Sequence, residues 1–107
     1  SQRRAKSYGR DELAQIKAEG EAVEQALADA FRDGLPPDSD EAMDAAEQHR
    51  QQINRWFYDC PPDFHRKLGD VYVNDPRYVA TYDESLGLPG LAAYCREAIH
   101  ANADRRR

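Results

Sequence analysis

Two cysteines and three histidines are the residues of this 107-residue chain with the widest chemical repertoire. Cys60 precedes His65 by five positions, and Cys95 precedes His100 by the same interval. Zinc sites use closely spaced ligand pairs, and five helical residues turn through about 500°, so neither pair shares one face. A cysteine nucleophile with a histidine base stays a minor alternative, because no flanking motif supports it. The sequence therefore predicts no metal site, no catalytic residue, no cofactor and no enzyme.

The stretch from His49 to Tyr82 holds most of the aromatic residues. An apolar helical stripe that ends at Trp56 and Phe57 runs into Pro61-Pro62, where the chain must turn. Two helices joined by so short a corner must pack together. We expect a ligand to bind on their shared surface, which is formed by Trp56, Phe57, Phe64, His65, Leu68 and Tyr72.

Two further tyrosines, Tyr78 and Tyr82, extend this aromatic surface. Three tyrosines within eleven residues can hold a flat organic molecule, or can equally well line a small core with their hydroxyls in water. His49 stands on an inner helical stripe where an aliphatic residue is expected. It is either a core histidine with one hydrogen bond or a ligand contact, and the sequence leaves both possibilities open.

Apolar periodicity predicts an all-α fold, because no strand pattern or internal repeat occurs. The expected helices cover about 10–34, 38–58, 62–74, 77–83 and 88–103. In the third helix, Phe64, Leu68, Val71 and Tyr72 are expected to form the core face, with His65 and Gly69 on an adjacent stripe. The first helix has a narrow apolar stripe that begins at Leu13 and is diluted by alanine and Gly20, so we expect this helix to be mobile without ligand.

Composition limits the possible partners. The chain is one domain with 33% charged residues, a net charge of -5 and a pI near 5.1, which argues against free-standing nucleic-acid binding. We interpret Arg3-Arg4-Lys6 and the basic tail 105–107 as solvated, with contact to DNA or a partner as the alternative. Two cysteines without a signal peptide or an apolar membrane span predict a cytoplasmic protein with no membrane partner.

Four ordered blocks of sequence carry a resemblance to a known family. They are Ala42-Met43-Asp44-Ala45-Ala46-Glu47-x-His49-Arg50-Gln51, then Tyr58-Asp59-Cys60, then His65-x-x-Leu68-Gly69-x-x-Tyr72-Val73-x-Asp75-x-Arg77, and the run from Gly90 to Ala103. Together they resemble the TipAS antibiotic-recognition domain, the C-terminal effector-binding half of certain MerR-family transcription regulators. The resemblance covers about residues 8–103, although the first helix matches only in outline.

This resemblance implies a globin-like bundle of about five helices with a surface cleft for thiopeptides or other bulky hydrophobic molecules. It implies a flexible segment at 1–9 and an effector-binding domain at 10–104. The cleft would involve the His49 helix with Ile53, Trp56 and Phe57, and the face from His65 to Tyr72. In the family, DNA is bound by a separate helix-turn-helix domain that is absent from this chain, and the full-length protein is a homodimer through a coiled coil.

One departure from the family pattern affects how a ligand would be held. Lys67 stands where the family has a thiopeptide-reactive cysteine, so we expect non-covalent binding here. Two alternatives from other classes stay open. One is a haem- or tetrapyrrole-binding globin-like sensor that uses His49 or His65 as axial ligand, and the other is a helical protein-interaction module.

Overall fold

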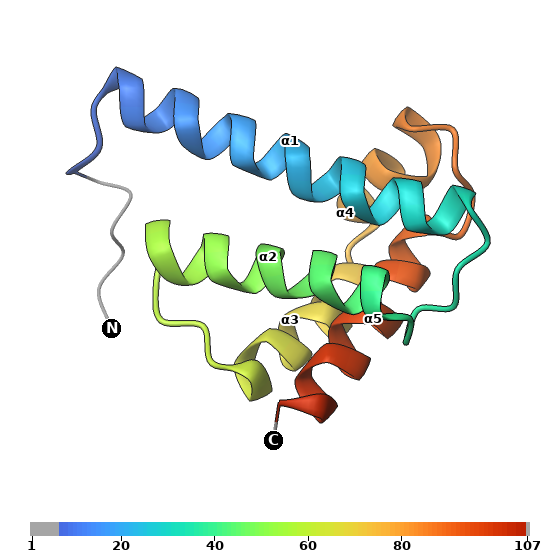
Figure 1. Cartoon of the computed structure of the whole chain (residues 1–107). Coiled ribbons are helices and arrows are strands. Elements are labelled where there is room, and N and C mark those ends of the chain that lie inside the picture. The colour runs from blue at the N-terminus through green and yellow to red at the C-terminus, as the bar shows by residue number, and fades with distance from the viewer. Residues whose placement is uncertain (1–6, 107) are drawn as a thin grey trace.

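The computed structural model describes residues 7–106 as a bundle of α-helices without strands. Its α-helices are α1 (Arg10–Arg32), α2 (Asp40–Trp56), α3 (Pro62–Val73), α4 (Pro76–Val79) and α5 (Leu91–Arg105), with a π-helix, η2 (Ala80–Ser85), after α4. α1 and α2 run antiparallel side by side, and α3 and α5 pack on each other below α2 (Figure 1). The predicted all-α class is confirmed.

Local sequence explains where the helices begin and end. Ser39 caps α2 by accepting a hydrogen bond from the Ala42 amide, and Pro61-Pro62 opens α3. α1 ends at Arg32, and Gly34 follows with a φ of 72° that suits glycine. α5 has no side-chain cap of its own, so Asp83 of η2 accepts from the amides of Gly90 and Ala92. The π-helix therefore holds the start of the last helix.

The core lies where α5 meets α1 and α2. Small residues such as Ala42, Ala46 and Ala98 are wholly buried and let the helices approach closely. The larger buried side chains include Leu27, Leu91 and Ile99. No helix in residues 7–106 is both long and apolar enough to cross a membrane.

The prediction for the core face of α3 is wrong for Phe64 and Val71, whereas Tyr72 does pack against the core. The buried residues of α3 are His65 and Gly69, whereas Phe64 and Val71 are exposed by 39% and 59%. A methyl group on Gly69 would lie 3.4 Å from Ile99 of α5, which is van der Waals contact, so this face of α3 lies directly against α5. The glycine face, and not the more apolar face, therefore packs against α5.

Three other expectations need correction. The short helix predicted at 77–83 is α4 followed by the wider π-turn of η2. Leu13, expected on the inner stripe of α1, is 51% exposed. The basic tail expected at 105–107 begins within α5, where Arg105 pairs with Asp44 and Arg106 with Glu47, although both arginines remain exposed. Arg3, Arg4, Lys6 and most of the segment 1–9 lie outside the described residues.

Candidate functional site

Five rings from three parts of the chain form a continuous ring cluster, which we define as His65, His49, Tyr72, Tyr78 and Tyr82. The ring centroids of His65 and His49 are 5.0 Å apart, and those of His49 and Tyr72 are 5.9 Å apart. Tyr72, Tyr78 and Tyr82 then stack with centroid distances of 4.3 Å at each step. The structure thus brings five of the predicted site residues into one contiguous cluster.

The two histidines of the cluster contact each other directly. His49 Nδ1 lies 2.8 Å from His65 Nε2. Burial lowers the pKa of His49 to about 4, and burial with the neighbouring His49 lowers the pKa of His65 to about 3. Both rings are therefore neutral at pH 7. His65 is wholly buried, whereas His49 keeps part of its surface exposed.

The tyrosines of the cluster stack nearly parallel, and η2 accounts for the stacking of Tyr82 on Tyr78. The planes of Tyr78 and Tyr82 differ by 16°, and those of Tyr72 and Tyr78 by 7°. Residues four apart are offset in rotation on an α-helix, and the wider π-turn reduces this offset and brings the two rings almost above each other. Burial raises the pKa of Tyr72, of Tyr78 and, to about 12, of Tyr82, so all three stay neutral near pH 7.

Apolar side chains at the α2–α3 corner form a second feature, which we call the corner patch: Phe57, Tyr58, Phe64, Leu68 and Val71. Tyr58 and Phe64 meet edge to face, with ring centroids 5.6 Å apart. Phe64, Leu68 and Val71 follow at four- and three-residue steps on α3 and remain partly or largely exposed. This is an apolar surface that a bulky hydrophobic molecule can cover.

Trp56 links the corner to α1. Its Nε1 donates to Glu19 Oε1 at 2.8 Å, and its ring meets the edge of Tyr8 at a centroid distance of 5.2 Å. Arg55 Nη1 lies 3.7 Å from the other oxygen of Glu19. Sequence analysis placed Trp56 on the ligand surface but missed its bond to Glu19, because spacing within one helix does not reveal the register between two helices.

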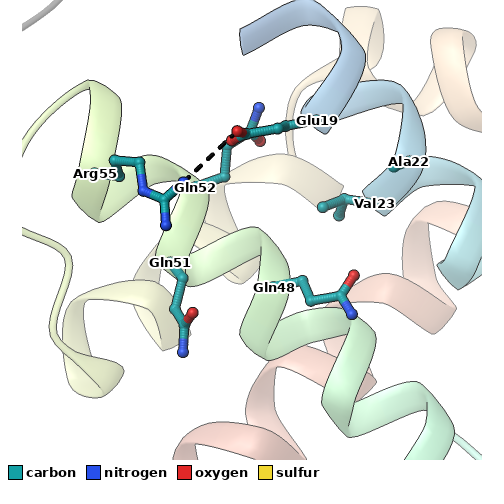
Figure 2. A pocket seen from close by; sticks show the side chains of 7 residues that line it. All are labelled: Glu19, Ala22, Val23, Gln48, Gln51, Gln52 and Arg55. Atoms are coloured by element: carbon teal, nitrogen blue, oxygen red, sulfur yellow. Dashed lines mark ion pairs between the residues drawn. The ribbon is translucent and has the colours of Figure 1, made fainter. Parts of the chain in front are cut away.

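A groove of about 210 Å³ lies between α1 and α2, next to this contact. Figure 2 shows Arg55 and Gln52 of α2 near Glu19 of α1, with the ion pair between Arg55 and Glu19 across the groove, while Gln51 points away from α1. None of the residues predicted for the site lines this groove. Gln52, which does, donates to the backbone oxygen of Ile16 at 2.8 Å and so ties α1 to α2.

The predicted site residues differ in accessibility. Ile53, His65 and Tyr82 are buried, so they support the surface from behind. Two of the predicted residues are exposed, Phe64 and Lys67. The remaining six are partly exposed: His49, Trp56, Phe57, Leu68, Tyr72 and Tyr78. Cys60 is wholly buried, and burial raises the pKa of its thiol to about 11. Among the described residues, no group of three or more possible ligands could hold a metal ion.

Glu47 is an important residue that sequence analysis did not single out. This buried carboxylate accepts hydrogen bonds from Arg50, Gln51 and Asn102 and pairs with Arg106. Burial alone would raise its pKa, but the hydrogen bonds from Arg50, Asn102 and Gln51 outweigh that effect and hold the pKa at about 2. Arg50 also donates to the backbone oxygen of Cys60, so Glu47 connects α2, α5 and the corner.

Sequence comparison places this chain in a family. Residues 1–102 match the model of the TipAS antibiotic-recognition domain. The chain is 42% identical over 105 residues to the HTH-type transcriptional activator TipA of Streptomyces coelicolor, covering 98% of this chain and 41% of TipA. It is 34% identical over 102 residues to the HTH-type transcriptional activator mta of Bacillus subtilis, covering 92% of this chain and 37% of mta. The chain belongs to the TipAS antibiotic-recognition domain family.

Solved structures agree with this assignment. TipAS of Streptomyces lividans, solved in complex with nosiheptide, superposes with a TM-score of 0.86 at 42% identity, covering 96% of this chain and 71% of TipAS. The antibiotic-binding domain of a TipA-class multidrug resistance regulator gives a TM-score of 0.73 at 45% identity, covering 85% of this chain and 95% of that domain. The family predicted from the sequence is thus confirmed, and the chain spans about two fifths of the length of the curated relatives that it matches.

Proposed function

We propose that this chain is the ligand-sensing effector domain of a MerR-type helix-turn-helix transcription regulator and binds bulky hydrophobic, thiopeptide-like drugs or metabolites. The observation that carries the proposal is the corner patch, in a domain 42% identical to TipAS, which was solved with the thiopeptide nosiheptide. Exposed apolar side chains that adjoin one another on a small polar domain indicate a binding surface. Binding, and not catalysis, is therefore the activity that we assign.

The bound molecule lies on the corner patch and extends toward the ring cluster. Four residues would contact the bound molecule from the corner: Phe57, Phe64, Lys67 and Leu68. Four others would contact it from the sides: His49, Trp56, Tyr72 and Tyr78. Ile53, His65 and Tyr82 are buried and would hold the contacting rings in place. Lys67 carries no thiol and Cys60 is wholly buried, so binding is reversible.

In the whole protein, this domain would act on partners that the chain itself does not contain. The curated relatives are HTH-type regulators, which supports a DNA-binding domain that precedes the present chain in sequence. We infer that the full-length protein is a cytoplasmic homodimer joined by a coiled coil. Ligand capture would change how that dimer engages its promoter.

Isothermal titration with nosiheptide tests the proposal, because Phe64 has a closely matched control. Phe64 is 39% exposed on the corner patch, and Leu86 is 38% exposed after η2. We expect Phe64→Ala to weaken binding about tenfold, which corresponds to about 1.4 kcal/mol, and Leu86→Ala to leave the affinity unchanged. Absence of nosiheptide binding, or equal losses in both variants, would place the function or the site elsewhere.

The haem alternative has less support from the geometry. An axial ligand needs a ring nitrogen whose lone pair reaches the iron. His65 is wholly buried and would have to move, whereas His49 could offer a bare Nε2 only if its Nδ1 donates to His65 across the 2.8 Å contact. A Soret band in the purified protein would support haem binding, and a colourless protein stabilised by hydrophobic drugs would support the ligand sensor.

A further inference from the structure

The contact between His49 and His65 determines where both rings carry their protons. His49 Nδ1 and His65 Nε2 are 2.8 Å apart, which is hydrogen-bonding distance. A neutral imidazole has one N–H donor and one bare nitrogen that accepts. When one ring donates across this contact, its other nitrogen is bare, and the accepting ring must then carry its proton on the far nitrogen.

Only two arrangements satisfy the contact. In the first, His49 Nδ1 donates, so His65 accepts at Nε2 and carries its own proton on Nδ1. In the second, His65 Nε2 donates, so His65 Nδ1 is bare, and His49 accepts at Nδ1 and carries its own proton on Nε2. The two arrangements therefore differ at all four ring nitrogens.

The environment of His65 Nδ1 favours the second arrangement. His65 is wholly buried, and its Nδ1 has no hydrogen-bond partner within residues 7–106. The first arrangement would leave a buried N–H donor without an acceptor there, whereas the second leaves a bare nitrogen. Among backbone groups, orphaned buried N–H donors are rarer than under-satisfied carbonyl acceptors, and we apply the same order of cost to the ring nitrogens.

We propose that His49 carries its ring proton on Nε2 in the free protein and offers it as a hydrogen-bond donor to the bound molecule. The second half of this statement rests on the function proposed above. His65 is wholly buried and His49 is only partly buried, so His49 is the member of the pair that lies nearer to solvent.

This assignment defines a chemical preference at one point of the site. A ligand must present an acceptor to His49, such as a carbonyl oxygen or the bare nitrogen of a neutral heteroaromatic ring. A ligand with a donor at this point would require a bare Nε2 on His49. The ring protons of His49 and His65 would then take the first arrangement, which leaves His65 Nδ1 as a buried, unpaired N–H. His65 is accordingly a positioning residue that fixes the proton on His49.

A long-range ¹H–¹⁵N correlation spectrum of the free, ¹⁵N-labelled protein at pH 7 tests the proton positions directly. Ring nitrogens with and without a proton differ strongly in ¹⁵N chemical shift. His49→Gln and His100→Gln variants assign the three rings by loss of signals. We expect bare Nδ1 and protonated Nε2 on both His49 and His65. Protonated Nδ1 on both rings would overturn the proposal.

Nosiheptide titration tests the donor role. The amide nitrogen of glutamine reaches about as far as Nε2 of histidine, whereas that of asparagine reaches only as far as Nδ1. We therefore expect His49→Gln to bind within about threefold of the unmodified protein and His49→Asn to lose about tenfold or more, the value of one hydrogen bond. Equal affinities, with the His49 Nε2 signal unmoved in the complex, would overturn the donor role.

The two proposals fail in distinguishable ways. If nosiheptide does not bind the unmodified protein, the proposed function is contradicted. The spectrum of the free protein still decides the proton positions, because it requires no ligand.

Discussion

The C-terminal half of α1 packs into the core, whereas its N-terminal half rests on α2 through a few polar contacts. Val23, Leu27, Ala28 and Ala30 are buried, but none of residues 10–20 is. The N-terminal half is held by the bond from Gln52 to the Ile16 oxygen and by Glu19, which binds Trp56 and Arg55. One continuous helix thus contains a core element and a loosely attached arm.

This difference shows how a small domain can keep a stable core while one segment changes its stability when a ligand binds. Isolated helices shorter than about 12–15 residues are marginal in water, so the N-terminal half of α1 depends on its contacts with α2. Those contacts involve Trp56, which we place at the edge of the ligand surface. A ligand that covers Trp56 would therefore stabilise the arm without disturbing the core.

Loss of the buried charge Glu47 should have the largest effect on stability. Truncation leaves Arg50 and Asn102 without their shared acceptor, so we expect Glu47→Ala to cost about 3–5 kcal/mol in urea unfolding. The matched change Glu19→Ala on the arm should cost about 1 kcal/mol or less, because its partners remain solvated. Similar costs for the two variants would mean that the arm is as firmly held as the core.

The same carboxylate predicts the response to acid. The folded-state pKa of Glu47, about 2, lies below its ordinary value of 4.5. The ionised Glu47 carboxylate therefore stabilises the folded state above about pH 4.5, and this contribution is lost as the pH falls toward 2. Unfolding free energies measured from pH 6 to pH 2 should show a decline that is largely absent in Glu47→Gln. An equally steep decline in that variant would assign the acid sensitivity to other groups.

Two leucines of α1 give a direct test of the comparison between its halves. Leu27 is fully buried, and we expect Leu27→Ala to cost about 2–5 kcal/mol through lost burial and the remaining cavity. Leu13 is 51% exposed, and Leu13→Ala should stay within about 0.5 kcal/mol. Urea denaturation of both variants supplies the measurement. A large cost at Leu13 would show that the arm belongs to the core.

Covalent capture should have no measurable extent. Lys67 has no thiol, and Cys60 is wholly buried with a pKa raised to about 11. Intact-mass spectrometry after long incubation with nosiheptide should therefore return the unmodified mass. A stable one-to-one adduct mapped to Lys67 or Cys60 would show that the surface opens enough to expose a nucleophile.

The sequence predicted the helices well but not how they meet. Capping at Ser39 and the prolines before α3 mark helix ends locally, so those bounds were accessible. The inward face of α3 was not, because it depends on how α3 packs on the distant α5, where Gly69 lies next to Ile99. Apolar periodicity favoured the opposite face, and that face forms part of the corner patch.

The candidate site shows the same division. Residue types predicted that His49 faces inward and that tyrosines gather, and five of the rings do meet. The contact of His49 with His65 depends on the relative placement of α2 and α3, and the stacking of Tyr78 on Tyr82 depends on the π-turn of η2. Neither feature has a signal in local sequence.

Hydrogen exchange followed by mass spectrometry, with and without nosiheptide, tests the account most directly. In the free protein, amides of residues 10–20 should exchange quickly, whereas those of 23–32 and of α5 should exchange slowly. With nosiheptide, exchange should slow across residues 10–20 and 56–72 and stay unchanged in α5. Slow exchange along all of α1 without ligand, or protection by nosiheptide confined to other regions, would contradict the account.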